Sequence, residues 1–417
     1  MSGSTLSTRC VIAGGGPAGM VCGTLLARAG IDVIVLEKHA DFLRDFRGDT
    51  VHPSTLEVFH ELGLLDEFLA LPHQEVRHLH MDIGGRRFTI GDFTHLPTHC
   101  KFIALMPQWD LLNFLARKAR AFPNFRLLMQ TKAITLIEKR GEVVGLRAQT
   151  REGELNICAE LVIGADGRHS TIREQAGFVP QEFGSPIDVI WFRLPLKPSD
   201  PQEPVARLAA GRFLVMLYRG DYWQCAFVVP KGGFEYIQHA GIDAFHARLA
   251  SIAGFAADRV GTIRSFDDVS LLTVTVDRLK QWARPGLLCI GDAAHAMSPV
   301  GGVGINLAVQ DAVATANILW KALKRARPTV EELNRVQARR ELPTRLTQSA
   351  QVLIQNRIVA PTLALEGELK PPIAMKLLDW FPVLRRIPAR LVGVGVRPEH
   401  VSKELRVWNG TAQPRIS

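Results

Sequence analysis

A glycine-rich turn between an apolar strand and a helix is the feature that most constrains how this chain can fold. Residues 9–13 form a short apolar run of the kind found in buried strands, and residues 14–19 read Gly-Gly-Gly-Pro-Ala-Gly. A helix is expected to follow, and then a second buried strand over residues 32–36. This order predicts a β-α-β unit, and such units build α/β folds whose parallel sheets are covered by helices.

The spacing of the glycines matches the dinucleotide-binding pattern GxGxxG. Gly14 suits the tight turn, Gly16 lets the backbone approach a pyrophosphate, and Gly19 permits close packing of the helix. Free N–H groups at the start of the helix favour phosphates. Glu37, at the end of the second strand, can accept hydrogen bonds from ribose hydroxyls. The alternative is a glycine turn that serves packing alone. We assign to a dinucleotide the residues Gly14, Gly16, Pro17, Ala18, Gly19, Glu37 and Lys38.

Two further glycine-rich segments follow buried strands. Residues 164–170 read Gly-Ala-Asp-Gly-Arg-His-Ser, and residues 291–295 read Gly-Asp-Ala-Ala-His. Each segment places an aspartate, Asp166 or Asp292, at the carboxyl end of a parallel strand, where ligands of open α/β sheets bind. A single Asp-Gly after a strand is usually a turn. Three such strand ends in one chain predict a shared binding site.

The character of the sequence changes between about residues 186 and 270. Strand-like pieces occur at 189–194, 213–218 and 222–229, and the last two are joined by a hairpin turn. An antiparallel insert of this kind predicts a second domain. We expect a nucleotide-binding domain of residues 1–75, 101–185 and 271–345, a substrate-binding β-sheet domain of residues 76–100 and 186–270, and a C-terminal helical region of residues 346–417.

Composition narrows the classes of function. The 417 residues are 47% hydrophobic and carry a net charge of +9 without long single-sign runs, which suits a globular protein with a basic surface. Because no basic stripe is interleaved with aromatic residues, we expect no nucleic-acid partner. The six cysteines are scattered without a CxxC pair, which argues against a metal site and against disulfides.

Targeting signals are also absent from the sequence pattern. Residues 1–9 lack the charged start and apolar core of a secretory signal. No apolar run reaches the roughly 18 residues that a membrane span needs. We therefore expect a cytoplasmic protein without stable membrane insertion, as a monomer or a homodimer.

Together with Pro-Val-Gly-Gly-Val-Gly-Ile-Asn at residues 299–306, the three motifs resemble those of the single-component flavoprotein aromatic hydroxylases, typified by para-hydroxybenzoate hydroxylase and phenol hydroxylase. The resemblance extends over residues 9–345. It implies a Rossmann-like FAD-binding domain interleaved with a substrate sheet, one FAD, and NADH or NADPH as a transient co-substrate. It also implies an FAD-dependent monooxygenase that uses dioxygen, through a flavin C4a-hydroperoxide, to hydroxylate a small aromatic molecule.

The resemblance implies roles for individual residues. Asp166, with Gly167, would lie near the pyrophosphate and aid access of the nicotinamide, while Asp292 would bind the ribityl chain. Arg47 and Gln108, which stand where the family places flavin contacts, would touch FAD. Beside the flavin ring would lie Pro299, Gly302, Gly304, Ile305 and Asn306.

The third motif suits a flavin on physical grounds. A helix predicted to start near Gly304 directs its amino terminus at the loop, where the positive helix end would stabilise an anionic reduced flavin by roughly 1–2 kcal/mol when partly buried. His295 is more typical of a packed, hydrogen-bonded histidine than of a catalytic acid or base. We assign no side chain a catalytic role, because the chemistry would be that of the flavin.

Substrate contacts are expected where the antiparallel insert meets the flavin. Alternation divides the strand 213–218 into two faces, and the sequence does not decide which of them meets the cofactor domain. The tyrosine pair that deprotonates phenols in some relatives is not recognisable, so the substrate stays open. The candidate pocket residues are Trp191, Arg193, Met216, Tyr218 and Trp223.

Other functions share the same cofactor motifs. The fold could carry out epoxidation or Baeyer–Villiger oxidation, act as a flavin-dependent reductase without oxygen transfer, or serve as a non-enzymatic redox sensor. The halogenase branch usually carries a WxWxIP element, which Trp-Phe-Arg-Leu-Pro at residues 191–195 does not match.

The segment 377–391 mixes apolar residues with arginines. Such a segment can lie on an anionic membrane, or it can pack as a lid or a subunit contact. Pro382 and Pro388 interrupt any long amphipathic helix, which favours packing.

Overall fold

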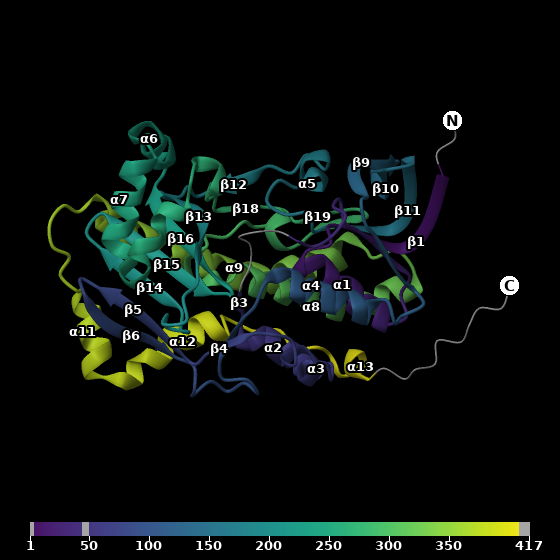
Figure 1. Cartoon of the computed structure of the whole chain (residues 1–417). Coiled ribbons are helices and arrows are strands. Elements are labelled where there is room, and N and C mark those ends of the chain that lie inside the picture. Colours follow the sequence, from purple (N-terminus) through teal and green to yellow (C-terminus); the bar gives the residue numbers. More distant parts are fainter. Residues whose placement is uncertain (1–3, 44–49, 408–417) are drawn as a thin grey trace.

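An eight-stranded sheet with a parallel centre and a seven-stranded, mostly antiparallel sheet lie at opposite ends of an elongated molecule, with long helices running between them (Figure 1). This computed structural model describes residues 4–43 and 50–407. The expected α/β fold with a second, antiparallel sheet is confirmed. Arg47 lies outside the described residues, so its assignment to FAD stays a prediction.

The parallel sheet is built around the first strand. Strand β1 (Ser4–Ala13) pairs in parallel with β2 (Val33–Leu36) on one side and with β11 (Gly153–Gly164) on the other. Strands β8 (Phe125–Leu128) and β20 (Leu287–Cys289) extend this arrangement in parallel, and β19 (Ala283–Arg284) closes one edge. A meander of β9 (Lys132–Lys139) and β10 (Glu142–Thr150) pairs with the first half of β11.

The register brings four strand ends to one edge of the parallel sheet. Ala13 of β1 lies opposite both Leu36 and Gly164, and Gly164 lies opposite Cys289. The glycine-rich segments that follow β1, β11 and β20 therefore leave the sheet side by side.

Three helices cover one face of the parallel sheet. Helix α1 (Pro17–Arg28) packs between α4 (Gln108–Ala119) and α8 (Gly304–Arg325), and ten of its residues are buried. Helix α8 begins at the residue that the sequence indicates. Helices α2 (Pro53–Glu61) and α3 (Leu65–Leu69) lie beyond α8, and α5 (Thr171–Gln175) follows β11.

The second sheet, here called the insert sheet, has seven strands in the order β17-β13-β16-β15-β14-β5-β6. Strand β16 (Tyr222–Pro230) pairs with β13 (Ile187–Pro195) and with β15 (Arg212–Tyr218), and the predicted hairpin turn at 219–221 joins β15 to β16. The remaining strands are β14 (Val205–Ala209), β17 (Ser270–Leu272), β5 (His78–Ile83) and β6 (Arg86–Asp92).

One face of the insert sheet is covered by helices α6 (Gly233–Ala240), α7 (Ile242–Ala253) and η1 (Gly254–Thr262). Phe192, Trp223 and Phe227 point into this layer, where Phe192 and Phe227 pack against Phe245 and Trp223 packs against Phe255. Two small sheets complete the strands: β3 (Thr50–Val51) with β7 (Ile103–Leu105) and β4 (Gln74–Val76), and β12 (Pro180–Glu182) with β18 (Asp277–Leu279).

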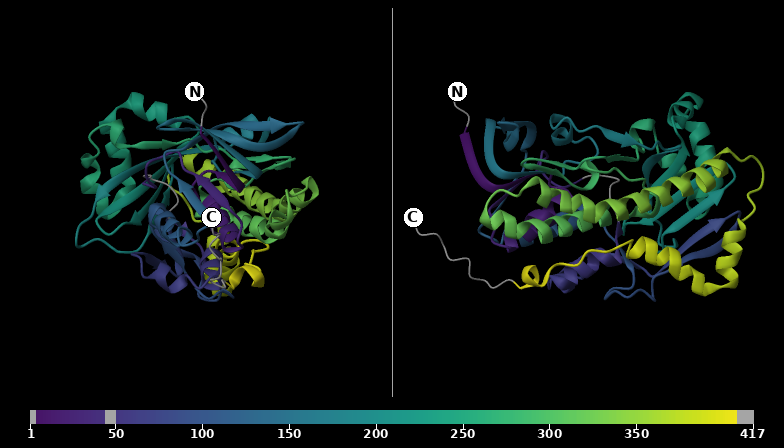
Figure 2. Two further views of the ribbon diagram at one scale, coloured as in Figure 1. Left: turned by 90° about the vertical axis from the view of Figure 1, so that its right-hand side faces the viewer. Right: turned by 180° about the vertical axis from the view of Figure 1, so that it is seen from behind.

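The C-terminal part of the chain connects the two sheets. Helix α9 (Val330–Ile354) starts beside α8 and runs towards the insert sheet, where η5 (Gln355–Val359) and α10 (Ala360–Ala364) continue it (Figure 2). Residue 345, the expected domain boundary, lies inside α9. Helices α11 (Ile373–Trp380), η6 (Pro382–Arg385), α12 (Arg386–Gly393) and α13 (Lys403–Arg406) then return along the molecule. No helix in the described ranges combines the length and apolarity needed to cross a membrane.

A buried ion pair ties the insert sheet to its helical cover. Asp200, in the loop before β14, accepts hydrogen bonds from the Arg259 guanidinium at 2.6 and 2.9 Å and from the Trp223 indole at 2.9 Å. Burial alone would raise the pKa of Asp200, but the bonds from Arg259, the Lys197 backbone and Trp223 outweigh it and lower the pKa from 3.8 to about 2. The folded protein therefore favours the ionised carboxylate.

We predict that Asp200→Asn lowers the free energy of unfolding of the insert by about 3–5 kcal/mol at neutral pH, because it leaves the buried Arg259 guanidinium with only the exposed Asp258 as a counter-ion. Since the folded pKa is depressed, the stability gained from ionisation is complete above the unfolded pKa and is lost as pH falls from about 4 towards about 2. Urea titrations should show the gap between the two proteins narrowing below about pH 4. Asp221→Asn, at the exposed hairpin turn, is the control, and a gap independent of pH would contradict this account.

Candidate active site

The first two glycine-rich segments touch each other. Gly14 has a φ of +109°, and a Cβ there would lie 2.2 Å from the carbonyl oxygen of Ala165 and 2.8 Å from the amide nitrogen of Asp166. Any side chain at this position would therefore push the first and second motifs apart. Gly19 is similarly confined, because a Cβ there would lie 1.9 Å from the Gly14 carbonyl oxygen.

The third segment reaches the same place. Gly291 has a φ of +58°, and a Cβ there would lie 3.1 Å from the Cβ of Ala18 in the first turn of α1. Across the sheet edge, Arg168 of the second motif lies 3.7 Å from the carboxylate of Asp292 in the third. The structure thus brings all three predicted motifs together at one edge of the parallel sheet.

The start of helix α1 has the shape that a pyrophosphate needs. Gly16 is its N-cap, no side chain caps the helix, and a Cβ at Gly16 would meet nothing within 4 Å. Open space therefore faces uncapped backbone N–H groups, the arrangement that binds phosphate in dinucleotide folds. Pro17 occupies the first helical position and Ala18 is buried, while Lys38 is exposed at the rim.

Glu37 lies at the end of β2, beside the glycine turn. Its carboxylate accepts hydrogen bonds from the backbone N–H groups of Gly15, at 3.3 Å, and His39, at 3.0 Å. These bonds hold the side chain against the turn where the ribose is expected. The position agrees with the predicted role, which stays a proposal.

Asp166 stabilises its own turn, a role that was not predicted from the sequence. Its carboxylate accepts hydrogen bonds from the Ser170 hydroxyl and, at 3.1 Å, from the Ile172 N–H, and so it closes the turn that begins α5. Burial raises its pKa, against the effect of these hydrogen bonds. Any contact of this motif with a cofactor would come mainly from the backbone around Gly167, which has a φ of +87° and open space beside it.

A buried carboxylate on α8 fixes the turn that carries Asp292. Asp311 accepts hydrogen bonds from the Gly291 N–H at 3.0 Å and from Arg340 at 3.0 Å, and it lies 2.6 Å from the Nε2 atom of His295. His295 is 1% exposed, so it is the packed histidine that the sequence favours. Neither Asp311 nor Arg340 was among the residues predicted for the site. The available signal was a charged residue on the otherwise apolar face of each of two predicted helices, which suggests a buried ion pair.

The loop before α8 is clamped by β3 and the start of α2. The Gly302 carbonyl accepts a hydrogen bond from the Thr50 hydroxyl at 2.7 Å and lies 3.0 Å from Nε2 of His52. Burial lowers the pKa of His52 to about 4, so the imidazole is neutral at physiological pH. A Cβ at Gly302, whose φ is +62°, would lie 2.7 Å from the Thr50 hydroxyl. The loop conformation therefore requires glycine.

The residues at the start of α8 divide into two groups. Gly304 has no side chain over it, and no side chain caps the helix, so backbone N–H groups face open space there. Pro299 precedes the turn. Ile305 and Asn306 are buried, and the Asn306 amide oxygen accepts hydrogen bonds from Ser54 and Thr55 at 2.7 and 2.9 Å. Asn306 therefore joins α8 to α2, an anchoring role that the sequence did not suggest.

A row of buried glutamines on α9 and η5 holds the same loop from behind. Gln351 accepts from the Ser298 N–H and donates to the carbonyls of Ser298 and Val300 at 2.9 and 2.8 Å. Gln348 donates to the Ala296 carbonyl at 2.9 Å, and Gln355 donates to the Ser298 hydroxyl at 2.7 Å. This row was also missed. Its i, i+3, i+7 spacing places all three side chains on one helical face.

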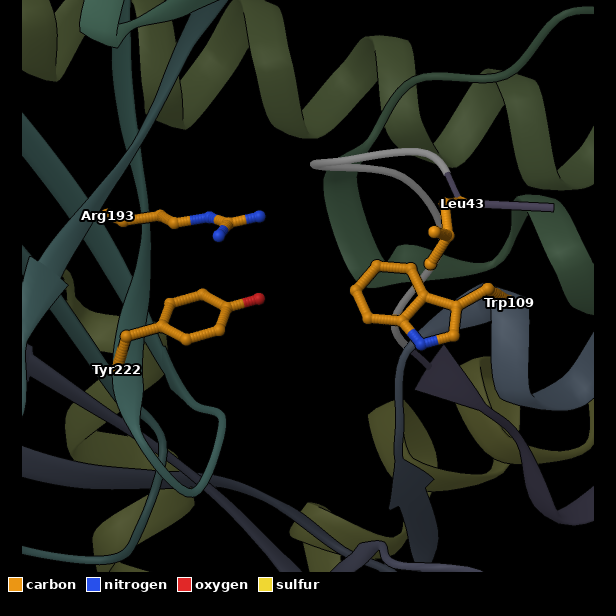
Figure 3. A pocket seen from close by; sticks show the side chains of 4 residues that line it. All are labelled: Leu43, Trp109, Arg193 and Tyr222. Carbon is orange, nitrogen blue, oxygen red and sulfur yellow. The ribbon is translucent and has the colours of Figure 1, made fainter. Parts of the chain in front are cut away.

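A cavity of about 340 Å³ lies between the insert sheet and the start of α4 (Figure 3). Arg193 of β13 and Tyr222 of β16 lie side by side and point across it, towards Trp109 of α4 and Leu43. The Arg193 guanidinium is 4.6 Å from the centre of the Tyr222 ring. The cavity thus has one cationic and aromatic wall and one apolar wall. Trp109 directly follows Gln108, which starts α4 and was predicted to contact FAD.

Only some of the predicted pocket residues lie on this wall. The assignment of Met216 and Trp223 to the pocket was wrong, because both are fully buried in the layer between the insert sheet and α7. Tyr218 packs against the same layer. Side chains alternate along a strand, so these residues face away from the cavity. Trp191 and Arg193 lie on the opposite face, together with Tyr222, which the sequence analysis missed.

Comparisons with known proteins agree with this geometry. A family model described as an FAD binding domain matches residues 7–349. The chain is 33% identical to the 6-methylpretetramide 4-monooxygenase of Streptomyces rimosus, over 92% of this chain and 91% of that protein. It is 27% identical to the rifampicin monooxygenase of Streptomyces venezuelae, over 75% of this chain but only 63% of that protein's length.

Solved structures share the fold. The p-nitrophenol 4-monooxygenase of Pseudomonas putida superposes with a TM-score of 0.73 at 19% identity, covering 92% of this chain and 97% of that one. The anhydrotetracycline hydroxylase of Streptomyces rimosus gives a TM-score of 0.71 at 22% identity, covering 93% of this chain and 76% of that one.

We predict that Asp292→Ala weakens FAD binding by roughly 1–3 kcal/mol, because a buried hydroxyl of the cofactor loses its partner at the end of β20. Titration of the cofactor-free protein with FAD, followed by flavin fluorescence, measures the effect. Glu152→Ala, at an exposed turn between β10 and β11, should bind FAD like the parent. Equal affinity of Asp292→Ala and the parent would show that this strand end does not hold the cofactor.

Proposed function

This chain belongs to the FAD-binding-domain family and is an FAD-dependent monooxygenase, and from this premise we propose that it uses NADH or NADPH and dioxygen to hydroxylate a small aromatic molecule. The observation that carries the proposal is the position of the cavity lined by Trp109, Arg193 and Tyr222. It lies between the insert sheet and the start of α4, the helix that opens with Gln108, and this is where we expect flavin and substrate to meet. Cavities at such junctions are the usual place for small-molecule sites.

The residues present fit one FAD. The open start of α1 at Gly16 would take the pyrophosphate, Glu37 the ribose and Asp292 the ribityl chain. The uncapped start of α8 at Gly304 would face the pyrimidine edge of the ring, where its partial positive charge favours an anionic reduced flavin. When bound, FAD supplies the redox chemistry and the reaction with dioxygen.

Reduction of the flavin would require NADH or NADPH to bind transiently and transfer a hydride. The described residues contain one strand-glycine-helix unit of the GxGxxG type, at β1 and α1, and the motifs that join it belong to the same site. A second nucleotide would therefore bind transiently from the cavity side. Arg168 lies at this edge, beside Asp292, and would offer a cation to its phosphates.

The chain's own side chains would position the substrate and keep water away from it. Trp191, Phe213 and Val215 form an apolar surface of the insert sheet with Val300 of the loop. Excluding water favours oxygen transfer to the substrate over release of hydrogen peroxide. Arg193 would bind an acidic oxygen of the substrate, and Tyr222 and Trp109 would contact its ring. A phenol with an ionisable hydroxyl has these features, and we propose a substrate of this class; the Streptomyces rimosus relative is named for oxidation of 6-methylpretetramide.

With its true substrate, the protein should consume one nicotinamide and one dioxygen for each oxygenated product. Turnover under heavy-isotope dioxygen, followed by mass spectrometry, should place one heavy oxygen atom in the product. The same reaction in heavy-isotope water is the control. Label that comes from water, or turnover that continues without dioxygen, would refute oxygen transfer and leave FAD binding untouched. The product's structure separates hydroxylation from epoxidation and Baeyer–Villiger insertion.

We predict that Arg193→Met lowers kcat/KM for a phenolic substrate by about 10- to 150-fold, the loss expected when a charge-assisted hydrogen bond worth roughly 1.5–3 kcal/mol is removed. The loss should appear mainly in KM, because Arg193 positions the substrate and takes no part in the chemistry of the flavin. Arg193→Lys should recover part of it, and Arg264→Met, at an exposed position of the insert, should behave like the parent. An unchanged KM in Arg193→Met would remove Arg193 from the substrate site.

A further inference from the structure

Helices α11, η6 and α12 form a helical hairpin at the outer end of the molecule, here called the C-terminal hairpin (residues 373–393). It lies at the lower left of Figure 1, along β6 of the insert sheet. Arg86 of β6 pairs with Asp379 at 2.7 Å. Gly393 packs so closely on Phe93 that a Cβ there would lie 3.1 Å from the ring. The inner side of the hairpin is therefore held firmly by the rest of the protein.

The outer side of the hairpin is apolar and exposed. On α11, Ile373, Leu377 and Trp380 are 72%, 39% and 67% exposed, and their i, i+4, i+7 spacing forms one stripe along the helix. The stripe continues through the turn after α11 and over η6 and α12, where four more large apolar side chains are between 54% and 58% exposed: Phe381, Val383, Ile387 and Leu391. Apolar surface of this extent usually marks a contact with a partner or a membrane.

Exposed lysine and arginine side chains accompany this apolar stripe. Lys376, Arg386 and Arg390 of the hairpin are exposed, as is Lys370 just before it. Asp379 is the single acidic residue between residues 370 and 393, and it is neutralised by Arg86 and by Arg385. The exposed side of the hairpin therefore combines large apolar side chains with uncompensated positive charge.

We propose that the outer side of the C-terminal hairpin docks on the surface of a membrane that contains anionic lipids. Trp380 and its apolar neighbours would lie among the headgroups and upper acyl chains, and the lysines and arginines would bind lipid phosphates. The proposal rests on the hairpin alone and is independent of the reaction proposed above. It concerns attachment to one surface of the bilayer and involves no membrane-spanning helix.

A second copy of this chain is the other occupant to consider. A two-fold symmetric contact through this stripe would bring the cations of both hairpins together, with no exposed acidic residue of either hairpin between them. Like charges at an interface oppose association, whereas anionic lipid complements them. Charge therefore favours the membrane.

The structure also changes what the two prolines imply. The sequence favoured packing of this segment because its prolines interrupt a long helix. Pro382 instead starts η6 after the turn, and Pro388 lies near the start of α12, so the prolines divide the segment into two short helices. Within the described chain nothing covers Trp380 or Ile387, so the segment is not a closed lid over the protein's own core.

The test is co-sedimentation of the full chain with vesicles of phosphatidylcholine alone and of phosphatidylcholine mixed with phosphatidylglycerol. We expect binding to the anionic vesicles that weakens at high salt, and little binding to the neutral ones. The variants Trp380→Ser with Ile387→Ser, and Arg386→Gln with Arg390→Gln, should each bind at least about tenfold less. Retained FAD binding shows that the variants are folded.

Matched controls come from exposed residues elsewhere. Val179→Ser with Tyr236→Ser removes apolar side chains that are 81% and 74% exposed, and Lys139→Gln with Arg151→Gln removes two exposed cations; both should bind vesicles like the parent. Equal loss in these controls would attribute binding to the general apolarity or charge of the surface and overturn the proposal. So would failure of the parent to bind anionic vesicles. In that case a dimer in sedimentation velocity that Trp380→Ser with Ile387→Ser dissociates would assign the stripe to a second copy.

Discussion

The register of the parallel sheet is the constraint on which the site depends. Because Ala13, Leu36, Gly164 and Cys289 lie level with one another, the segments that follow their strands must leave the sheet within a few ångströms. That crowding is tolerable only without side chains, as the 2.2 Å between a Cβ at Gly14 and the Ala165 carbonyl shows. The glycines therefore do two things at once. They let three loops approach each other, and they leave backbone N–H groups open to a cofactor.

Buried polar groups then give the loops a fixed shape. Asp311 is fully buried and gathers the Gly291 N–H, His295 and Arg340, and the favourable contacts with His295 and Arg340 outweigh burial and lower its pKa. Removing one partner of such a network weakens the compensation of a buried charge, and breaking a buried pair costs up to about 3–5 kcal/mol, so these groups stabilise the turn together. Gln351 acts on the next loop by satisfying its carbonyls. The order of the site thus comes from groups that never face the cavity.

The difference between local signals and long-range contacts explains which features of the site could be predicted from the sequence. Strand ends and the start of α8 at Gly304 were readable, because glycine spacing and apolar runs are local signals. The roles of Asn306, Asp311 and Gln351 were not, since each depends on a partner far along the chain. The insert shows the limit most clearly. Alternation separates Met216 from the opposite face, but only the packing of α7 decides which face is core. Met216 was therefore assigned to the pocket wrongly, while Tyr222, next to the hairpin turn, was missed.

The C-terminal segment links the interior of the site to the outside of the molecule. Val392 of α12 packs with Met297 and Val303 of the loop before α8, and it lies 3.9 Å from where a Cβ of Gly301 would be. Leu391, the preceding residue, points outward in the exposed apolar stripe. This turn of α12 therefore contacts the loop through Val392 and carries an exposed apolar side chain, Leu391, on its other face. An aromatic substrate poorly soluble in water would concentrate in a lipid surface, and an enzyme attached through α12 would hold its loop close to that surface. The same rigid contact that orders the loop from within would then set the distance between the site and its supply of substrate.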